Sequence, residues 1–251
     1  MEHTSKIIEL NEHDLIQSIQ SNTISVCVIG IGRIGLPTAL SFANSGISTI
    51  GVDINSKLVE MINSKIFPLK DEPGYDVIFD KVINEKKFRA TTNFSEGVNS
   101  SDVIVLSLPT PMNDQNIPDY SALLSVAKRL HDEMFDGKLI IIESTVEPGF
   151  VETDFLKILE GNDEKLKLGK NFSLGVCPET ANPGQILNDF ERLPRLVGAM
   201  DEDTQNLIIK IYKHVFTVDL LPMPDCKTAN AVKLTTNVFR DLNIAFVNEL
   251  A

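Results

Sequence analysis

Short apolar runs alternate with amphipathic segments along the chain from Ile24 onward. Several runs are apolar at consecutive positions, as expected of parallel strands that are covered by helices on both faces. The segments between the runs carry helical spacing and suitable helix starts. The predicted strands are 24–30, 47–53, 88–92, 102–108, 138–144, 172–177, 195–200 and 215–220, and the predicted helices include 34–45, 55–64, 119–134, 147–160 and 201–213. This alternation favours a doubly wound, mostly parallel α/β sheet.

Both ends of the chain add a helix to this pattern. Residues 13–21 predict a short amphipathic helix packed outside the main fold, and residues 227–251 predict one long helix. Two prolines in "LPMPDC" at 221–226 separate that long helix from the last predicted strand. The expected division is an N-terminal extension, a sheet domain and the start of a long central helix, at 1–23, 24–223 and 224–251.

The composition describes an acidic globular protein and restricts its partners. Of 251 residues, 43% are hydrophobic and 23% are charged, and the net charge is −12. An acidic surface argues against nucleic acid or an anionic membrane as a partner. No apolar run approaches the roughly 20 residues that cross a bilayer, and the N-terminus lacks a signal-peptide pattern. Three widely spaced cysteines suggest neither a disulfide framework nor a metal site, so we expect a cytoplasmic protein.

The strongest motif is "VCVIGIGRIGLPTALSFA", which places Gly30, Gly32 and Gly35 as G-x-G-x-x-G after a strand and at the start of a helix. In such a turn the first glycine permits the tight bend, the second lets the backbone approach a pyrophosphate, and the third allows close helix packing. The expected cofactor site includes these glycines together with Arg33 and Ile34. The motif therefore predicts a Rossmann-type dinucleotide-binding domain.

Asp53 strengthens this prediction because it ends the next strand, in "IGVDINS", at the position where an acid binds the ribose hydroxyls. A carboxylate there would repel a 2′-phosphate, so NAD is preferred over NADP. The alternative is a plain glycine turn in which Asp53 caps the helix at 55–64.

Three further strand ends carry polar residues that point to the same crevice. Thr110 lies in "LSLPTPM", Ser144 and Thr145 lie in "IIESTVEPG", and Glu179 lies in "VCPETANPG". Ligands of such sheets bind beyond the carboxyl ends of the strands, so both threonines are candidates for cofactor contacts. Taken alone, either threonine is more typical of a cap or a turn, and Glu179 is equally consistent with a solvated surface position.

Seven motifs in order resemble the N-terminal half of the nucleotide-sugar 6-dehydrogenases. These enzymes oxidise UDP-glucose, UDP-N-acetylmannosamine or UDP-N-acetylglucosamine to uronic acids for polysaccharide biosynthesis. The motifs are "VIGIGRIGLPTA", "FPLKDEPG", "LSLPTPM", "IIESTVEPG", "CPETANPG", "RLVGAM" and "ANAVKLTTNVFRDLNIAFVNELA". The loop "PETANPG" resembles the N-acetylhexosamine branch more than the UDP-glucose branch.

The resemblance implies roles for five residues. Lys233 would serve as an acid–base group or would stabilise an oxyanion at the reacting oxygen, and Asn237 would help to hold that oxygen. Their spacing of four places both on one face of a helix. Glu179 would orient water or assist thioester hydrolysis, Thr145 would share that water near the nicotinamide, and Arg240 would reach the substrate. Without the motif context, this lysine and asparagine would be interpreted as ordinary surface residues of a helix.

Two features depart from the family pattern. Thr180 follows Glu179 where the family has an arginine, and the family's nucleophilic cysteine belongs to a segment beyond the central helix. We expect Cys27, Cys177 and Cys226 to be packing residues. The resemblance therefore implies a truncated form that binds NAD, lacks the catalytic cysteine and the UDP-binding domain, and forms a homodimer through the terminal helix.

Two alternatives remain open at this point. The first is a β-hydroxyacid or 6-phosphogluconate type dehydrogenase, which also combines a Rossmann domain with a helical lysine and asparagine. The second is a non-catalytic NAD-binding partner that lends its terminal helix to a complete homologue.

Overall fold

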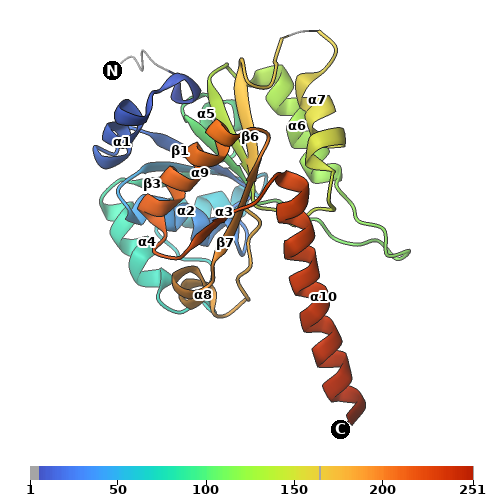
Figure 1. Cartoon of the computed structure of the whole chain (residues 1–251). Coiled ribbons are helices and arrows are strands. Elements are labelled where there is room, and N and C mark those ends of the chain that lie inside the picture. The colour runs from blue at the N-terminus through green and yellow to red at the C-terminus, as the bar shows by residue number, and fades with distance from the viewer. Residues whose placement is uncertain (1–5, 164, 251) are drawn as a thin grey trace.

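The computed structural model describes residues 6–163 and 165–250, and its centre is one eight-stranded sheet (Figure 1). The strand order is β3-β2-β1-β4-β5-β6-β7-β8, and every pair is parallel except β6 with β7. The strands are β1 (Ser25–Ile29), β2 (Ser48–Val52), β3 (Phe88–Thr91), β4 (Val103–Leu106), β5 (Lys138–Ile142), β6 (Phe172–Val176), β7 (Arg195–Ala199) and β8 (Leu220–Pro222). The first six follow the order of a dinucleotide-binding sheet, which confirms the predicted fold class.

Helices cover both faces of this sheet. The helices are α1 (Glu12–Gln20), α2 (Gly35–Asn44), α3 (Ser56–Asn63), α4 (Tyr75–Asn84), α5 (Phe94–Asn99), α6 (Ser121–Glu133), α7 (Leu156–Glu160), α8 (Ile186–Arg192), α9 (Glu202–Val215) and α10 (Cys226–Leu250). A 3-10 turn, η1 (Ile7–Glu9), precedes α1, and a π-helical turn, η2 (Val151–Phe155), leads into α7. None of the described helices is long and apolar enough to cross a membrane.

Alternating strand residues supply two separate cores. Val26 and Val28 of β1 pack on the side of α2, α4 and α9, whereas Cys27 and Ile29 pack on the side of α5, α6 and α7. The same alternation holds along β4 and β5, because successive side chains of a strand point to opposite faces. Because both faces of these strands are buried, consecutive strand residues must be apolar, and the sequence shows no alternation of apolar and polar residues there.

The long helix α10 buries side chains only near its base, among the residues that the structure describes. Cys226 and Ala229 are buried on the face of the sheet that η2 also covers, where α10 packs against β6 and β7, and Asn230 and Lys233 are buried beside them. Beyond them the helix leaves the rest of the protein as a single rod that ends at the C-terminus (Figure 1). Its apolar residues Phe239 and Phe246 are exposed on that rod.

Most predicted elements are present, with three differences. The strand predicted at 215–220 is wrong, because α9 continues to Val215 and the short strand β8 begins only at Leu220. Helices α4, α5 and α8 fall outside the segments that the pattern identified. The helix predicted at 13–21 forms as α1, but Leu15 and Ile19 belong to the main core, so the helix does not lie outside the fold. The first five residues of the predicted extension and Ala251 lie outside the described residues.

Candidate active site

The glycine loop between β1 and α2 has room for a ligand at one position and none at two others. Gly30 has φ +86°, and a Cβ there would lie 2.5 Å from the carbonyl oxygen of Ser107. A Cβ on Gly35 would lie 1.9 Å from the carbonyl oxygen of Gly30. A Cβ on Gly32 would meet no protein atom within 4 Å. Gly30 and Gly35 therefore serve the close packing of the turn, and Gly32 leaves open the approach that a dinucleotide pyrophosphate needs.

Asp53 is held against this loop at the end of β2. Its Oδ2 accepts a hydrogen bond from the backbone N–H of Ile31 at 3.1 Å, and Oδ1 accepts from Asn55 N at 2.9 Å. Asn55, rather than Asp53, caps α3 by accepting from Leu58 N at 3.2 Å. The capping alternative for Asp53 is therefore wrong, whereas its binding of the ribose hydroxyls stays a prediction.

The Arg33 side chain contacts acids of the segment before α4. Its Nη2 pairs with Asp71, and the same nitrogen lies 3.4 Å from Oε1 of Glu72. Glu72 in turn accepts hydrogen bonds from the backbone N–H groups of Gly184 and Ile186 at 2.6 and 3.3 Å. The sequence motif "FPLKDEPG" contains both acids, yet sequence reasoning assigned them no role.

Hydroxyl groups join the ends of β4 and β5. Thr110 donates from Oγ1 to the carbonyl oxygen of Thr145 at 2.8 Å. Ser144 Oγ accepts from Leu108 N and donates to Leu108 O, each at 2.8 Å. The structure thus brings the two predicted threonines together. Hydrogen bonds from side-chain hydroxyls to backbone groups connect the ends of the two strands.

Glu179 lies in the loop of residues 177–185 that follows β6, which we call the Glu179 loop. Its backbone N–H donates to the carbonyl oxygen of Glu143 at 3.2 Å, and both of its carboxylate oxygens accept from Ala181 N at 2.7 Å. Farther along the loop, Asn182 Oδ1 accepts from Nη1 of Arg240 on α10 at 2.5 Å. The loop therefore connects the sheet to the long helix.

Lys233 is buried at the base of α10 and contacts Asn237. It is 7% exposed, and its Nζ donates to Oδ1 of Asn237 at 3.2 Å. Burial lowers the pKa of Lys233, the charge of Glu179 raises it, and the charge of Arg240 lowers it. The charges of Glu179 and Arg240 therefore act on Lys233, which contacts Asn237 directly. The helix-surface alternative is wrong for this lysine.

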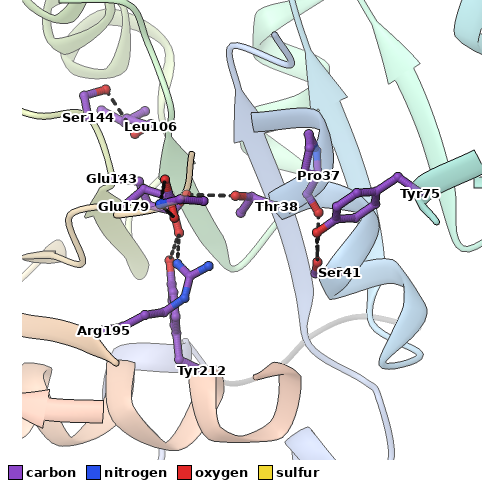
Figure 2. Close-up of polar contacts among 11 residues, drawn as sticks. Pro37, Thr38, Ser41, Tyr75, Leu106, Glu143, Ser144, Glu179, Arg195 and Tyr212 are labelled. Atoms are coloured by element: carbon purple, nitrogen blue, oxygen red, sulfur yellow. Dashed lines mark hydrogen bonds and ion pairs between the residues drawn. The ribbon is translucent and has the colours of Figure 1, made fainter. Parts of the chain in front are cut away.

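A buried polar cluster around Glu143 lies at the end of β5 beside Glu179 (Figure 2). Its Oε1 accepts from Tyr212 at 2.9 Å and from Nη1 of Arg195 at 3.4 Å, and its Oε2 accepts from Thr38 at 3.0 Å. Burial raises the pKa of Glu143, whereas Arg195 opposes this rise. Sequence reasoning did not identify this cluster. The available signal was the presence of Glu143 and Arg195 within or next to otherwise apolar strands.

All three cysteines are buried and unpaired. Burial raises the pKa of each thiol, and that of Cys177 reaches about 12. A thiol with such a pKa is a poor nucleophile at neutral pH, because the thiolate is the reactive form. The prediction that they are packing residues agrees with their positions.

The glycine loop, the acid after β2 and the polar strand ends define a dinucleotide-binding dehydrogenase domain. Comparison with known proteins gives the family. The pattern of the UDP-glucose/GDP-mannose dehydrogenase family, NAD binding domain, matches residues 24–216, and the chain belongs to this family. NAD is therefore its cofactor.

The relatives are nucleotide-sugar dehydrogenases. A UDP-N-acetyl-D-mannosamine dehydrogenase of Campylobacter jejuni is 36% identical over 90% of this chain and 56% of its own length. The structure of the Pyrococcus horikoshii UDP-D-ManNAc dehydrogenase matches with a TM-score of 0.83 and 34% identity, over 90% of this chain and 53% of that one. An NDP-N-acetyl-D-galactosaminuronic acid dehydrogenase of Methanosarcina mazei matches with a TM-score of 0.82 and 31% identity, over 98% and 52%. This chain spans about half the length of these relatives.

Proposed function

We propose that this chain is the NAD-binding half of a nucleotide-sugar 6-dehydrogenase, which oxidises a UDP-sugar at C6 to the uronate. The contact between Lys233 and Asn237, within electrostatic range of Glu179, is the observation that carries the proposal. Bound NAD supplies the hydride acceptor for such an oxidation. Family membership favours this reaction over the β-hydroxyacid alternative.

The proposed roles follow from the environment of each group. A desolvated Lys233 has a lowered pKa, so it can exchange a proton closer to neutral pH or stabilise an oxyanion as a cation. Asn237 is held by Lys233 and presents its amide N–H groups to the reacting oxygen. Glu179 orients water, Thr145 contributes a hydroxyl at the end of β5, and Arg240 binds the substrate from the exposed face of α10.

The favoured substrate is a UDP-N-acetylhexosamine such as UDP-N-acetylmannosamine or UDP-N-acetylglucosamine, ahead of UDP-glucose. The "PETANPG" loop and the names of the relatives support this preference. We further propose a cytoplasmic protein, which the three unpaired cysteines support.

A homodimer through α10 completes the proposal. Much of the helix beyond Lys233 presents apolar side chains to solvent, and such a surface requires a partner. The exposed apolar residues are Val238, Phe239, Leu242, Ile244, Phe246, Val247 and Leu250. The alternative of a non-catalytic partner that docks on a complete homologue would use the same helix face.

Calorimetric titration of the chain with NAD, NADP and the UDP-sugars, followed by an NADH absorbance assay, tests the proposal. We expect NAD binding, weaker NADP binding because of Asp53, and no sustained NADH formation, since none of the three cysteines offers a thiolate. Absence of NAD binding would contradict the cofactor role. Sustained turnover would show that this chain alone completes the reaction and would contradict its role as a half.

A further inference from the structure

Glu72 is a buried carboxylate to which the proposed reaction assigns no role. The residue is 2% exposed, and it lies between the glycine loop and the end of the Glu179 loop. Its Oε1 accepts from Gly184 N at 2.6 Å, and its Oε2 accepts from Ile186 N at 3.3 Å. Nη2 of Arg33 lies 3.4 Å from Oε1.

A buried carboxylate is unfavourable unless hydrogen bonds and an opposite charge compensate for lost water. Here two backbone N–H groups and one guanidinium provide that compensation, and they come from the Glu179 loop, the first residue of α8 and the glycine loop. Gly184 adopts φ +85°, a conformation that suits glycine and turns its N–H toward Glu72. The end of the Glu179 loop is therefore fixed by the side chain of Glu72 and not by its own sequence alone.

Arg33 gives this anchor a connection to the cofactor loop. It follows Gly32 directly, and its guanidinium is shared between exposed Asp71 and buried Glu72. In loops of this kind the pyrophosphate of a dinucleotide binds beside the second glycine. The Arg33 guanidinium therefore pairs with two acids, and it belongs to the residue next to the glycine beside which a pyrophosphate would bind.

We propose that Glu72 is a positioning residue that fixes the end of the Glu179 loop relative to the glycine loop. We further propose that, through Arg33, dinucleotide binding changes the strength of the hydrogen bonds that Glu72 accepts. This inference rests on the proposed function for the role of Glu179. A guanidinium drawn toward phosphates neutralises Glu72 less, and the carboxylate then accepts more strongly from Gly184 and Ile186. Dinucleotide binding thus tightens the end of the Glu179 loop.

Hydrogen exchange of the full chain without NAD tests the positioning role. In Glu72→Gln an amide donor faces one of the two N–H groups and the negative charge is lost. We expect exchange at Gly184 and Ile186 to rise about tenfold, as a charge-assisted bond is replaced by a neutral one. Asp71→Asn is the matched control, because Asp71 pairs with the same arginine, whereas Glu72 is the acid that accepts from Gly184 and Ile186. Equal exchange in Glu72→Gln and wild type, or an equal rise in Asp71→Asn, would overturn the proposal. Thermal unfolding confirms that each variant is folded.

Exchange with saturating NAD tests the coupling, which a purely structural role of Glu72 would not show. We expect NAD to slow exchange at the two amides by about threefold in wild type and to leave it unchanged in Arg33→Gln. The same slowing in both proteins would overturn the role of Arg33. Calorimetry on the same samples separates the two proposals: if NAD does not bind, the proposed function fails, whereas the Glu72→Gln comparison still tests the anchor.

Discussion

Arg195 of β7 and Glu143 at the end of β5 form an ion pair in the interior, with Nη1 3.4 Å from Oε1 and both side chains at most 2% exposed. Two hydroxyls, from Thr38 and Tyr212, donate to the same carboxylate. Phe216 lies over the guanidinium at 3.9 Å. Side chains of α2, β7 and α9 therefore all contact the Glu143 carboxylate. The backbone carbonyl of the same residue accepts the N–H of Glu179.

Removal of the carboxylate should destabilise the chain through the cation that remains. In Glu143→Gln we expect unfolding to become easier by about 3–5 kcal/mol, the range for a buried pair that loses one partner. The double variant Glu143→Gln with Arg195→Met removes that cation and should recover a large part of the loss. Urea unfolding of the single and double variants measures both values. A double variant that loses the sum of the two single effects would contradict the coupling.

The glycine loop predicts opposite outcomes for two alanine substitutions. Gly35→Ala places a Cβ 1.9 Å from Gly30 O and should destabilise the chain by about 2 kcal/mol or more. Gly32→Ala meets no protein atom within 4 Å, so we expect unchanged thermal unfolding but roughly tenfold weaker NAD binding. Calorimetry and thermal unfolding distinguish the two. Unchanged NAD affinity in Gly32→Ala would show that the dinucleotide does not approach this backbone.

The environment of Lys233 predicts how its pKa responds to neighbours. We expect a value below the ordinary 10.5, which falls further in Glu179→Gln and rises in Arg240→Gln. Glu191→Gln, an exposed acid on α8, is the control and should leave it unchanged. NMR titration of the labelled lysine side chain measures the pKa directly. A value in wild type at or above 10.5 would contradict the desolvation argument.

The same shift predicts a direction for stability against pH. Between the folded pKa of Lys233 and the unfolded value of 10.5, the unfolded chain binds more protons than the folded chain. The free energy of unfolding contributed by this group therefore rises with pH across that window. Lys233→Met should lack this contribution, which a comparison of urea unfolding at several alkaline pH values reveals. Identical pH slopes in the two proteins would refute this assignment.

Sequence patterns predicted most of the sheet because its strands are buried on both faces. Residues such as Val26 and Cys27 must both be apolar, and consecutive apolar positions make a strand easy to recognise. The last strand was misplaced because α9 ends in "KHV" and Phe216 follows it, and these apolar residues suit either a helix end or a strand. Local periodicity cannot decide between them, whereas packing of Phe216 against Phe42 and Tyr212 does.

The candidate site was predicted where a motif fixes local geometry, and missed where partners come from distant segments. The glycines and Asp53 follow from one strand–turn–helix unit. In contrast, Glu72 meets Gly184 across 112 positions of sequence, and Glu143 meets Arg195 across 52. No spacing rule links such residues, because only the folded sheet brings them together. Roles for Lys233 and Asn237 came from the family resemblance rather than from their helical spacing.

The buried thiols predict resistance to alkylation. Burial raises the pKa of Cys177 to about 12, so the thiolate is rare at pH 8, and burial also blocks the reagent. We expect iodoacetamide to modify none of the three cysteines in the native chain and all of them in urea, as read by mass spectrometry. Fast native labelling of Cys177 would instead identify a reactive thiol beside Glu179.

The exposed rod of α10 predicts association of the chain. An isolated helix segment has little stability in water without packing on its apolar face. Phe246 is 64% exposed on this rod, so we expect wild type to be a dimer and Phe246→Asp to be a monomer. Asp241→Asn changes an exposed polar residue of the same helix and is the matched control. Light scattering after size-exclusion chromatography over a range of concentrations measures the mass. A monomeric wild type, or a dimer that Phe246→Asp leaves intact, would contradict pairing through this face and direct attention to a different partner surface.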